Sequence, residues 1–310
     1  MPKNKRILIT GATGFIGANL AHYFSKLGFD VHAFVRKGSD VWRIRGLLRI
    51  INIYKTDLLD AASVKKAVQK ARPDYIFHTA AYGGHYYQND TQKIIAVNFL
   101  GTVNLITACK EVDYKLFINT GSSSEYGTRL LPMKESDLVE PITDYGVSKA
   151  ACTLYAITAA KRERKPIVTL RLFSPYGYYE SEARLVPTVI LAYLKKKRPK
   201  LSSPGCVRDF VFIDDVMDAY LKAIKNEKTL EGEVINIASG IQNTVGNVVR
   251  ITARLLGSKI RPDWGSIENL RCEPKRWQAD ISKARKLLGW KPKFNLEHGL
   301  KKTIGWYESI

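Results

Sequence analysis

A glycine-rich turn directly after a short apolar strand sets the strictest limit on how this chain folds. The strand is predicted over Arg6 to Thr10, and a helix is predicted from Phe15 to Leu27. The turn between them has glycines at Gly11, Gly14 and Gly17, a GxxGxxG pattern. A strand, a glycine turn and a helix in this order offer free N–H groups and the positive end of a helix to a pyrophosphate. The pattern therefore predicts a dinucleotide-binding unit.

Each glycine of this turn has its own task. Gly11 allows the tight turn, Gly14 lets the backbone approach a pyrophosphate, and Gly17 lets the helix pack closely on the strand. A glycine-rich turn without a ligand is the alternative interpretation. The cofactor contacts predicted in this turn are Gly11, Thr13, Gly14, Phe15, Ile16 and Gly17.

Strands and helices alternate through the first half of the chain. Further strands are predicted over 31–35, 50–54, 75–79, 115–120 and 167–172, and further helices over 63–71, 91–109 and 145–161. This alternation is typical of a parallel sheet with crossover helices. The predicted fold class is α/β, a Rossmann-type doubly wound parallel sheet with a smaller α/β carboxy-terminal lobe.

The alternation ends after about residue 174. Strands are predicted over 209–213 and 233–238, helices over 216–224, 245–256 and 281–288, and a basic tail that ends in Trp306. We expect residues 1–173 to form the dinucleotide-binding domain and residues 174–310 to form mainly a substrate lobe. The segment from about 207 to 238 is expected to return to the main domain.

The end of the second strand indicates which dinucleotide would bind. Enzymes that use NAD usually place an acid there, which accepts hydrogen bonds from the adenosine ribose. Here the strand runs into Arg36 and Lys37, followed by Ser39. A 2′-phosphate would pair with these two cations and with the hydroxyl group. We therefore predict NADP(H) as the preferred cofactor, with NAD(H) as the alternative; two solvated surface cations are the interpretation without a ligand.

The net charge is high. The chain has 310 residues, with 49 Lys and Arg against 29 Asp and Glu, a formal charge of +20. The densest basic runs, 195–198, 161–165 and 283–293, stand at the ends of predicted helices, where cations suit the helix dipole. No RNA-binding signature or zinc finger accompanies them. We expect no nucleic-acid partner, and a basic surface that attracts an anionic substrate.

Apolar stretches and cysteines exclude further classes. No uninterrupted apolar stretch approaches the ~18 residues of a membrane span, and the apolar run 7–9 is too short for a secretory leader. We expect a cytoplasmic protein without a membrane partner. The four cysteines lie far apart, without a CxxC pair or a histidine at ligand spacing, so no metal site is predicted.

A phenol and an ammonium group stand at helical spacing in the predicted helix 145–161. Tyr145 and Lys149 are separated by four residues and so share one helix face. A neighbouring cation favours the phenolate, which suits acid–base work. Upstream, three serines, Ser122 to Ser124, follow the fifth strand. A serine there could hold a substrate oxygen beside Tyr145, and a polar turn is the alternative.

Together these motifs resemble those of the extended short-chain dehydrogenase/reductase family, the nucleotide-sugar epimerases, dehydratases and reductases. The resemblance covers essentially the whole chain. It rests on TGATGFIG at 10–17, Asp-Leu at 57–58, HTAA at 78–81, VNFLGTVNL at 97–105, the serine segment, YGVSK at 145–149, RLFSPYG at 171–177, RDFVFIDDV at 208–216 and the run 276–290.

The resemblance implies roles for individual residues. Tyr145 would be the general acid and base, and Lys149 would bind the nicotinamide ribose. Aligned without gaps over 117–127, the catalytic hydroxyl falls on Ser122, with Ser123 as the alternative. Further cofactor contacts implied by the resemblance are Asp57, Leu58, Thr79, Ala80, Ala81 and Asn98.

The substrate implied by the resemblance is a sugar nucleotide. Arg208 and Arg276 would bind its diphosphate, because guanidinium groups fit phosphate oxygens, and Ser123 would lie at the substrate. Ser174 would lie nearby, where the family often has Asn. A homodimer is a further implication.

The serine segment discriminates among members of the family. Sugar-nucleotide 4,6-dehydratases carry Asp-Glu after the catalytic Thr, whereas here Ser123 and Ser124 stand in those places and Glu125 comes one step late. This leaves hydride transfer at one carbon, and the resemblance of the serine segment together with Arg36 and Lys37 favours, as the first hypothesis, NADPH-dependent reduction of a 4-keto sugar nucleotide by hydride transfer at C4. This interpretation places the chain nearest to deoxyhexose 4-keto reductases of the CDP-paratose synthase type.

Other functions remain open at this point. The alternative is an NAD-dependent nucleotide-sugar 4-epimerase of the UDP-hexose type, and a 4,6-dehydratase is less favoured. A protein that kept the fold but only senses NADP(H) or binds RNA is a further hypothesis, opposed by the intact residues Ser122, Tyr145 and Lys149.

Overall fold

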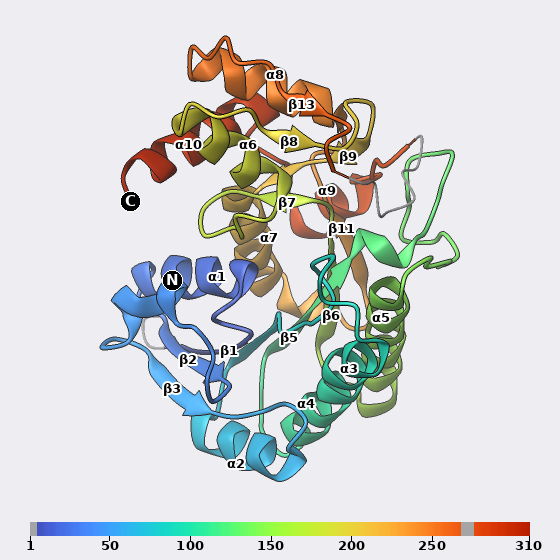
Figure 1. The fold of residues 1–310 in the computed structure, drawn as a ribbon. Coiled ribbons are helices and arrows are strands. Elements are labelled where there is room, and N and C mark those ends of the chain that lie inside the picture. The colour runs from blue at the N-terminus through green and yellow to red at the C-terminus, as the bar shows by residue number, and fades with distance from the viewer. Residues whose placement is uncertain (1–4, 268–275) are drawn as a thin grey trace.

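The main body of the molecule is a sheet of seven parallel strands in the order β11-β6-β5-β4-β1-β2-β3 (Figure 1). The computed structural model describes residues 5–267 and 276–310. The strand order confirms the predicted doubly wound sheet. Its strands are β1 (Arg6–Thr10), β2 (Asp30–Val35), β3 (Asn52–Lys55), β4 (Tyr75–His78), β5 (Leu116–Ser122), β6 (Ile167–Leu172) and β11 (Val234–Ile237).

The strand order reverses at β1, which lies between β2 and β4. Thr10, the last residue of β1, is in register with Phe34 on one side and His78 on the other. Open α/β sheets bind ligands beyond the carboxyl ends of their strands at such a switch point. The glycine turn that follows β1 lies there.

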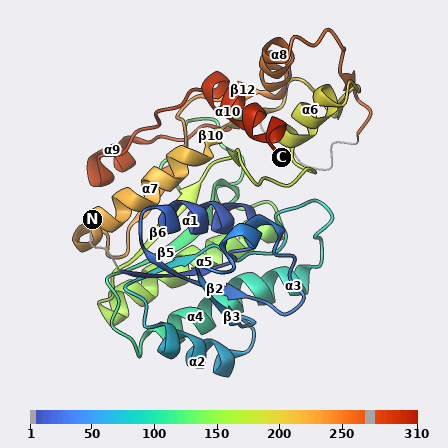
Figure 2. The ribbon, with the colours of Figure 1, turned by 90° about the vertical axis from the view of Figure 1, so that its left-hand side faces the viewer.

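Helices cover both faces of the sheet (Figures 1 and 2). One face carries α1 and α7, which contact each other, and the other carries α2, α4 and α5. In α2, Val64, Val68 and Ala71 recur on one buried stripe, as expected for an amphipathic helix. The elements around the sheet are α1 (Phe15–Lys26), η1 (Trp42–Leu47), α2 (Ala61–Ala71), α3 (Thr91–Ile95), η2 (Ala96–Leu100), α4 (Gly101–Cys109), η3 (Ser123–Glu125), α5 (Asp144–Glu163), α7 (Ile213–Lys225) and η4 (Glu227–Thr229).

The predicted helix over 91–109 is continuous but contains a turn of π-helix, η2, between α3 and α4. Within the described ranges, it is the one helix whose length and mean hydropathy of 1.2 would let it cross a membrane. Here 44% of its most apolar window is buried, and core helices of globular proteins meet the same criterion. The helix contacts α2 and α5.

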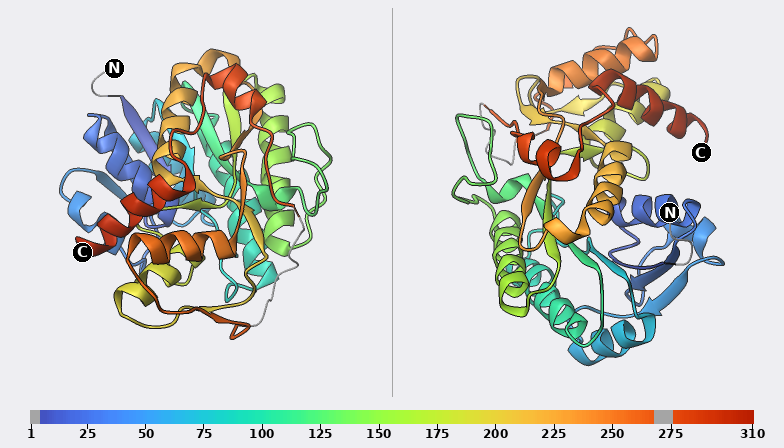
Figure 3. Two further views of the ribbon diagram at one scale, coloured as in Figure 1. Left: turned by 90° about the horizontal axis from the view of Figure 1, so that it is seen from above. Right: turned by 180° about the vertical axis from the view of Figure 1, so that it is seen from behind.

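A smaller lobe stands over the carboxyl ends of the strands. Seen from behind in the right-hand view of Figure 3, α8 (orange) and α10 (dark red) lie at the end of this lobe that is farthest from the sheet. Its helices α6, α8 and α10 contact one another. The remaining elements are β7 (Pro175–Tyr176), α6 (Leu185–Leu194), β8 (Lys200–Leu201), β9 (Val207–Asp209), β10 (Val211–Phe212), β12 (Gln242–Thr244), α8 (Val245–Leu255), β13 (Asp263–Trp264), α9 (Ser282–Leu288) and α10 (Leu296–Glu308).

This half differs in detail from the prediction. The strand predicted over 209–213 is two strands with different partners, because β9 pairs with β12 and β10 with β7, and Ile213 already begins α7. Helix α6 continues through Pro187, which lies in its first turn, where a missing N–H does no harm. The basic tail is the helix α10, which begins after the capping side chain of Asn295.

The segment 207–238 contributes to both parts of the molecule. Strand β9 pairs with β12 in the lobe, whereas β11 is the edge strand of the main sheet next to β6. Between them, α7 packs against α1 and α9. The domain boundary at residue 173 stays a prediction.

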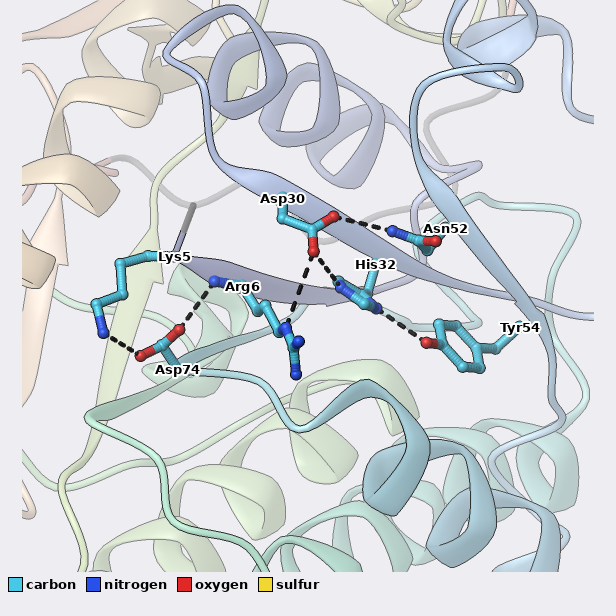
Figure 4. A network of polar contacts seen from close by, with 7 residues as sticks. All are labelled: Lys5, Arg6, Asp30, His32, Asn52, Tyr54 and Asp74. Carbon is cyan, nitrogen blue, oxygen red and sulfur yellow. Dashed lines mark hydrogen bonds and ion pairs between the residues drawn. The ribbon is translucent and has the colours of Figure 1, made fainter. Parts of the chain in front are cut away.

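A polar network ties together the amino ends of the strands, at the edge opposite the glycine turn (Figure 4). Asp30 accepts hydrogen bonds from His32 at 3.0 Å and from Asn52 at 2.9 Å, and Asp74 pairs with Lys5 at 2.8 Å. None of these side chains was predicted to act in a site. These contacts join the start of β2 to the start of β3, and the residue before β1 to the residue before β4.

Candidate active site

The glycine turn leaves no room for side chains. Gly11 has a φ of +69°, and a Cβ built there would lie 2.6 Å from the backbone nitrogen of Ala80. A Cβ at Gly17 would collide with the carbonyl oxygen of Gly11. Gly14 is the N-cap residue of α1 and provides no side-chain cap, so the first N–H groups of the helix stay available to a ligand. These features fit the pyrophosphate of a dinucleotide.

Neutral hydrogen-bonding groups join β1 to β4 beside this turn. Thr79 donates from its hydroxyl to the carbonyl oxygen of Thr10 at 2.7 Å. The buried ring of His78 bridges Thr10 Oγ1 at 2.7 Å and Thr102 Oγ1 at 2.8 Å. Burial, aided by the charge of Lys149, lowers the pKa of His78 to about 3. This histidine is therefore neutral and structural.

The end of β2 presents two exposed cations. Arg36 and Lys37 follow the strand, and Gly38 at a φ of +79° turns the chain so that the N–H of Ser39 donates to the carbonyl oxygen of Arg36 at 3.1 Å. Within residues 5–267 and 276–310, neither cation pairs with a carboxylate. The exposed Asp57 side chain accepts the N–H of Leu59 at 3.0 Å, while Leu58 is buried.

Tyr145 and Lys149 lie in the first two turns of α5. Thr143 begins the helix, because its hydroxyl accepts the N–H of Gly146 at 3.0 Å. Tyr145 is half-buried, whereas Lys149 is 3% exposed. In the described part of the chain, no carboxylate pairs with the Lys149 ammonium group. A buried cation without a counter-charge is costly, and ribose hydroxyls of a bound dinucleotide would supply the acceptors that it lacks.

Asn98 connects the helix over 91–109 to α5. It lies in the π-turn η2, and such turns often occur at functional positions. Its amide nitrogen donates to Ser148 Oγ and to the Tyr82 carbonyl oxygen, both at 2.8 Å, and its oxygen accepts the N–H of Tyr82 at 2.7 Å. The segment after β4, which contains the predicted contacts Ala80 and Ala81, is thereby fixed against α5.

The serine turn, residues 122–124, gives the two predicted catalytic hydroxyls different partners. Ser122 ends β5, and its hydroxyl accepts the N–H of Ser124 at 3.2 Å. Ser123 is buried and its hydroxyl accepts the indole N–H of Trp277 at 3.2 Å. Because the Ser123 hydroxyl has this partner in the lobe, the geometry favours Ser122 as the hydroxyl that meets a substrate.

Glu125 makes its contacts inside the fold. It is completely buried, accepts the N–H of Ser122 at 2.7 Å and pairs with Arg171 at 2.9 Å. Sequence reasoning noted only that Glu125 comes one step late. It missed Arg171 as its partner, because Glu125 lies on η3 and Arg171 lies on β6, 46 positions later.

The predicted substrate residues have different surroundings. The Arg208 guanidinium lies 5.6 Å from the ring centroid of Trp277, whose indole N–H binds Ser123. Ser174 follows β6 with a φ of 27°, a strained conformation that is typical of functional segments. Arg276 instead donates to the carbonyl oxygen of Leu130 at 3.1 Å.

Trp277 was missed by sequence reasoning, although it lies within one of the motifs. A single tryptophan has no ligand signature, and its hydrogen bond to Ser123 joins residues 154 positions apart. For metals, the described ranges contain no group of three or more His, Cys, Asp or Glu side chains placed to hold an ion. Cys272 lies outside the described residues.

Comparison with protein families adds a finding to this geometry. Residues 7–238 match the model of the NAD dependent epimerase/dehydratase family. That span runs from the first strand to the end of the main sheet.

Individual relatives cover nearly the whole chain. The UDP-glucuronate 4-epimerase of Thermodesulfobacterium geofontis is 27% identical over 96% of this chain and 95% of its own. The dTDP-glucose 4,6-dehydratase of Haemophilus influenzae is 25% identical over 97% of each chain. A crystal structure of UDP-glucuronic acid 4-epimerase from Bacillus cereus, in complex with UDP-4-deoxy-4-fluoro-glucuronic acid and NAD, superposes with a TM-score of 0.88, 28% identity and coverage of 98% and 99%.

Proposed function

The chain belongs to the NAD-dependent epimerase/dehydratase family, and from this premise we propose that it is a nucleotide-sugar 4-epimerase. The substrate is a nucleoside diphosphate hexose, and the reaction inverts the configuration of the hydroxyl-bearing C4. Relatives of this length that are 4-epimerases support the assignment.

The observation that carries this proposal is the burial of Glu125 and its pairing with Arg171. Dehydration across C5 and C6 needs a carboxylic acid next to the catalytic hydroxyl. Here the nearest acid in the sequence is completely buried and pairs with Arg171. Chemistry confined to C4 needs only a hydroxyl, a phenol and an ammonium group, which Ser122, Tyr145 and Lys149 provide.

These three residues have separate tasks in the proposed reaction. Tyr145, as phenolate, takes the proton of the C4 hydroxyl and later returns it to the C4 oxygen. Lys149 favours the phenolate by its charge. The hydroxyl of Ser122 donates to the C4 oxygen while negative charge develops on it.

The same chain holds the dinucleotide. Gly11, Gly14 and Gly17 admit the pyrophosphate, and Lys149 binds the ribose next to the nicotinamide. A nicotinamide ring bound there would supply a reversible hydride acceptor for C4. In an epimerase the sugar must turn over between the loss and the return of the hydride. Arg208 would bind the diphosphate and so anchor the nucleotide while the sugar turns.

The test uses the purified protein without added cofactor. UDP-glucose, UDP-glucuronic acid, UDP-N-acetylglucosamine and dTDP-glucose are incubated separately, and the products are identified by proton NMR. The proposal expects the C4 epimer from at least one of them. Formation of a 4-keto-6-deoxy sugar would instead identify a dehydratase.

One observation favours a second candidate, an NADPH-dependent 4-keto reductase. Arg36 and Lys37 stand at the end of β2, where NAD enzymes usually have an acid. Two cations and the Ser39 hydroxyl suit the 2′-phosphate of NADP(H). A reductase consumes NADPH, whereas an epimerase recycles its cofactor.

Titration calorimetry with NADP⁺ and NAD⁺ tests this candidate first. Tighter binding of NADP⁺, together with loss of NADPH absorbance on addition of a 4-keto-6-deoxy sugar nucleotide, would establish the reductase. Tighter binding of NAD⁺ would remove the observation on which it rests.

The assembly proposed for either function is a homodimer. Leu100 at the end of η2 and Val147 and Leu154 on α5 are each about half exposed. Large apolar side chains on neighbouring helices favour an interface. Light scattering coupled to gel filtration would give twice the chain mass of 35.0 kDa. A mass of one chain would refute the dimer.

A further inference from the structure

The serine turn is held from inside the sheet by a buried ion pair. Glu125 on η3 and Arg171 on β6 are at most 4% exposed in their side chains. Both Nε and Nη2 of Arg171 contact the same carboxylate oxygen, Oε2, at 2.9 Å. The other oxygen, Oε1, accepts the N–H of Ser122 at 2.7 Å. One carboxylate thus joins the arginine to the residue that carries the predicted catalytic hydroxyl.

The space around this carboxylate is closed. A Cβ built on Gly121 would lie 2.8 Å from Glu125 Oε1 and 2.7 Å from the Thr169 side chain. The carboxylate therefore has little freedom to move without moving the turn. Ser122 and Glu125 form the capping box of η3, in which the Ser122 hydroxyl accepts a backbone N–H of the turn and the Glu125 carboxylate accepts the N–H of Ser122.

The arginine is fixed in turn by the aromatic ring of Tyr126. Its guanidinium carbon lies 4.4 Å from the ring centroid, and the Tyr126 hydroxyl donates to Asn236 Oδ1 at 2.8 Å. Asn236 is on β11 and donates to the carbonyl oxygens of Met133 at 3.0 Å and Asp280 at 3.3 Å. The pair is thereby connected to segments that flank Trp277.

We propose that Glu125 and Arg171 are positioning residues that hold the Ser122 hydroxyl at the C4 oxygen of the substrate. The inference rests on the proposed function, in which Ser122 meets that oxygen. Neither residue touches the substrate or exchanges a proton with it. Their effect passes through the backbone N–H of Ser122.

The experiment compares Glu125→Gln with a matched control, Asp215→Asn. Asp215 is also buried and accepts backbone N–H groups, those of Lys293 and Phe294, but it lies on α7. Both carboxylate oxygens of Glu125 accept hydrogen bonds, whereas glutamine has one oxygen, so its N–H₂ group faces a donor, either Arg171 or the N–H of Ser122, and one of the two contacts is lost. A misplaced hydroxyl is expected to lower kcat by about 10- to 100-fold, with KM for the sugar nucleotide and the midpoints of the pH profile unchanged.

A second readout needs no catalysis. The indole N–H of Trp277 binds Ser123 in the same turn, and the indole of Trp290 donates to the carbonyl oxygen of Asp215. In nitrogen-15 NMR spectra, Glu125→Gln is expected to move the Trp277 signal, and Asp215→Asn the Trp290 signal. If Glu125→Gln fails to fold, Arg171→Lys replaces it, because lysine keeps the charge and loses the fork.

The outcomes are distinct. Wild-type kcat in a folded Glu125→Gln variant, an unmoved Trp277 signal, or an equal loss of kcat in Asp215→Asn would each overturn the positioning role. A pH profile that loses an ionisation in Glu125→Gln would make Glu125 a proton carrier and also overturn it. A wild-type protein inactive on every sugar nucleotide would instead refute the proposed function, and the Trp277 signal would still decide whether the pair holds the turn.

Discussion

At the scale of single residues, the predicted cofactor site depends on the lack of a side chain at Gly17. A methyl group at Gly17 would meet the carbonyl oxygen of Gly11 and lie 2.8 Å from Thr79 Oγ1. Both neighbours are held by the sheet, so the turn itself must move. We predict that Gly17→Ala binds dinucleotide at least about 10-fold more weakly, a cost near 1.4 kcal/mol.

The control for this prediction is Gly305→Ala. Gly305 lies within α10, and a Cβ there meets nothing within 4 Å. Fluorescence titration with NAD⁺ and NADP⁺ measures both variants beside the wild type. Equal affinities for all three would mean that the dinucleotide does not bind at this turn.

A second residue-scale prediction concerns His78 and pH. Its pKa falls from the ordinary value of 6.5 in an unfolded chain to about 3 in the fold, because burial disfavours the cation. Between these values the unfolded chain binds a proton that the folded chain does not bind. Stability is therefore lost as the pH falls from 6.5, by up to about 1.4 kcal/mol per pH unit from this group.

Urea unfolding at several pH values between 7 and 4 tests this against His78→Gln, which cannot titrate. Asp209 and Asp215, whose pKa values burial raises to about 6, act in the opposite direction, but they are common to both proteins. The stability difference between wild type and variant should shrink steadily as the pH falls. A difference that stays constant would contradict a buried, neutral His78.

At the scale of elements, α5 begins close to the reacting groups. The Thr143 hydroxyl caps the helix two residues before Tyr145. We predict that Thr143→Ala costs about 1 kcal/mol of stability and also lowers kcat, because the first turn that carries Tyr145 frays. Asn295→Ala removes the equivalent cap of α10, at 2.9 Å to the N–H of His298.

Thermal unfolding and steady-state kinetics on both variants separate the two effects. Asn295→Ala should lose similar stability and keep its kcat. If Thr143→Ala also keeps its kcat, the start of α5 does not control the position of Tyr145.

Most elements of the main sheet could be predicted because they are local patterns. The strand over 6–10 and the strand over 167–172 coincide with β1 and β6. The lobe was less predictable, because β9 and β10 are each two or three residues long and are defined by their partners β12 and β7 rather than by their own pattern. Helix α6 was not predicted, and Pro187 lies in its first turn, where a helix tolerates proline.

At the scale of the whole molecule, the two halves meet through segments far apart in sequence. The Tyr179 ring stacks on that of His22 of α1, with 4.8 Å between the ring centroids, and lies edge-on to that of Trp306 of α10, with 5.0 Å between the centroids. Arg43 donates to the carbonyl oxygens of Tyr179 at 2.7 Å and of Thr13, in the glycine turn, at 3.2 Å. The lobe is thereby attached directly to the turn that would bind the cofactor.

Separation along the sequence also explains which part of the site could be predicted. The glycine turn and the pair Tyr145 and Lys149 are each contained within eight residues, so spacing reveals them. Trp277 with Ser123 and Arg171 with Glu125 come together only when the sheet and the lobe have formed. A sequence pattern carries no signal for such pairs.

The most direct test of the proposed chemistry follows a deuterium atom at C4 of the sugar nucleotide. In the wild-type protein, without added cofactor, we predict that the C4 epimer forms and keeps its deuterium on C4, because the hydride leaves and returns to the same carbon. Tyr145→Phe should still bind the sugar nucleotide but react at least about 100-fold more slowly. Loss of the deuterium to solvent, or an undiminished rate in Tyr145→Phe, would contradict this mechanism.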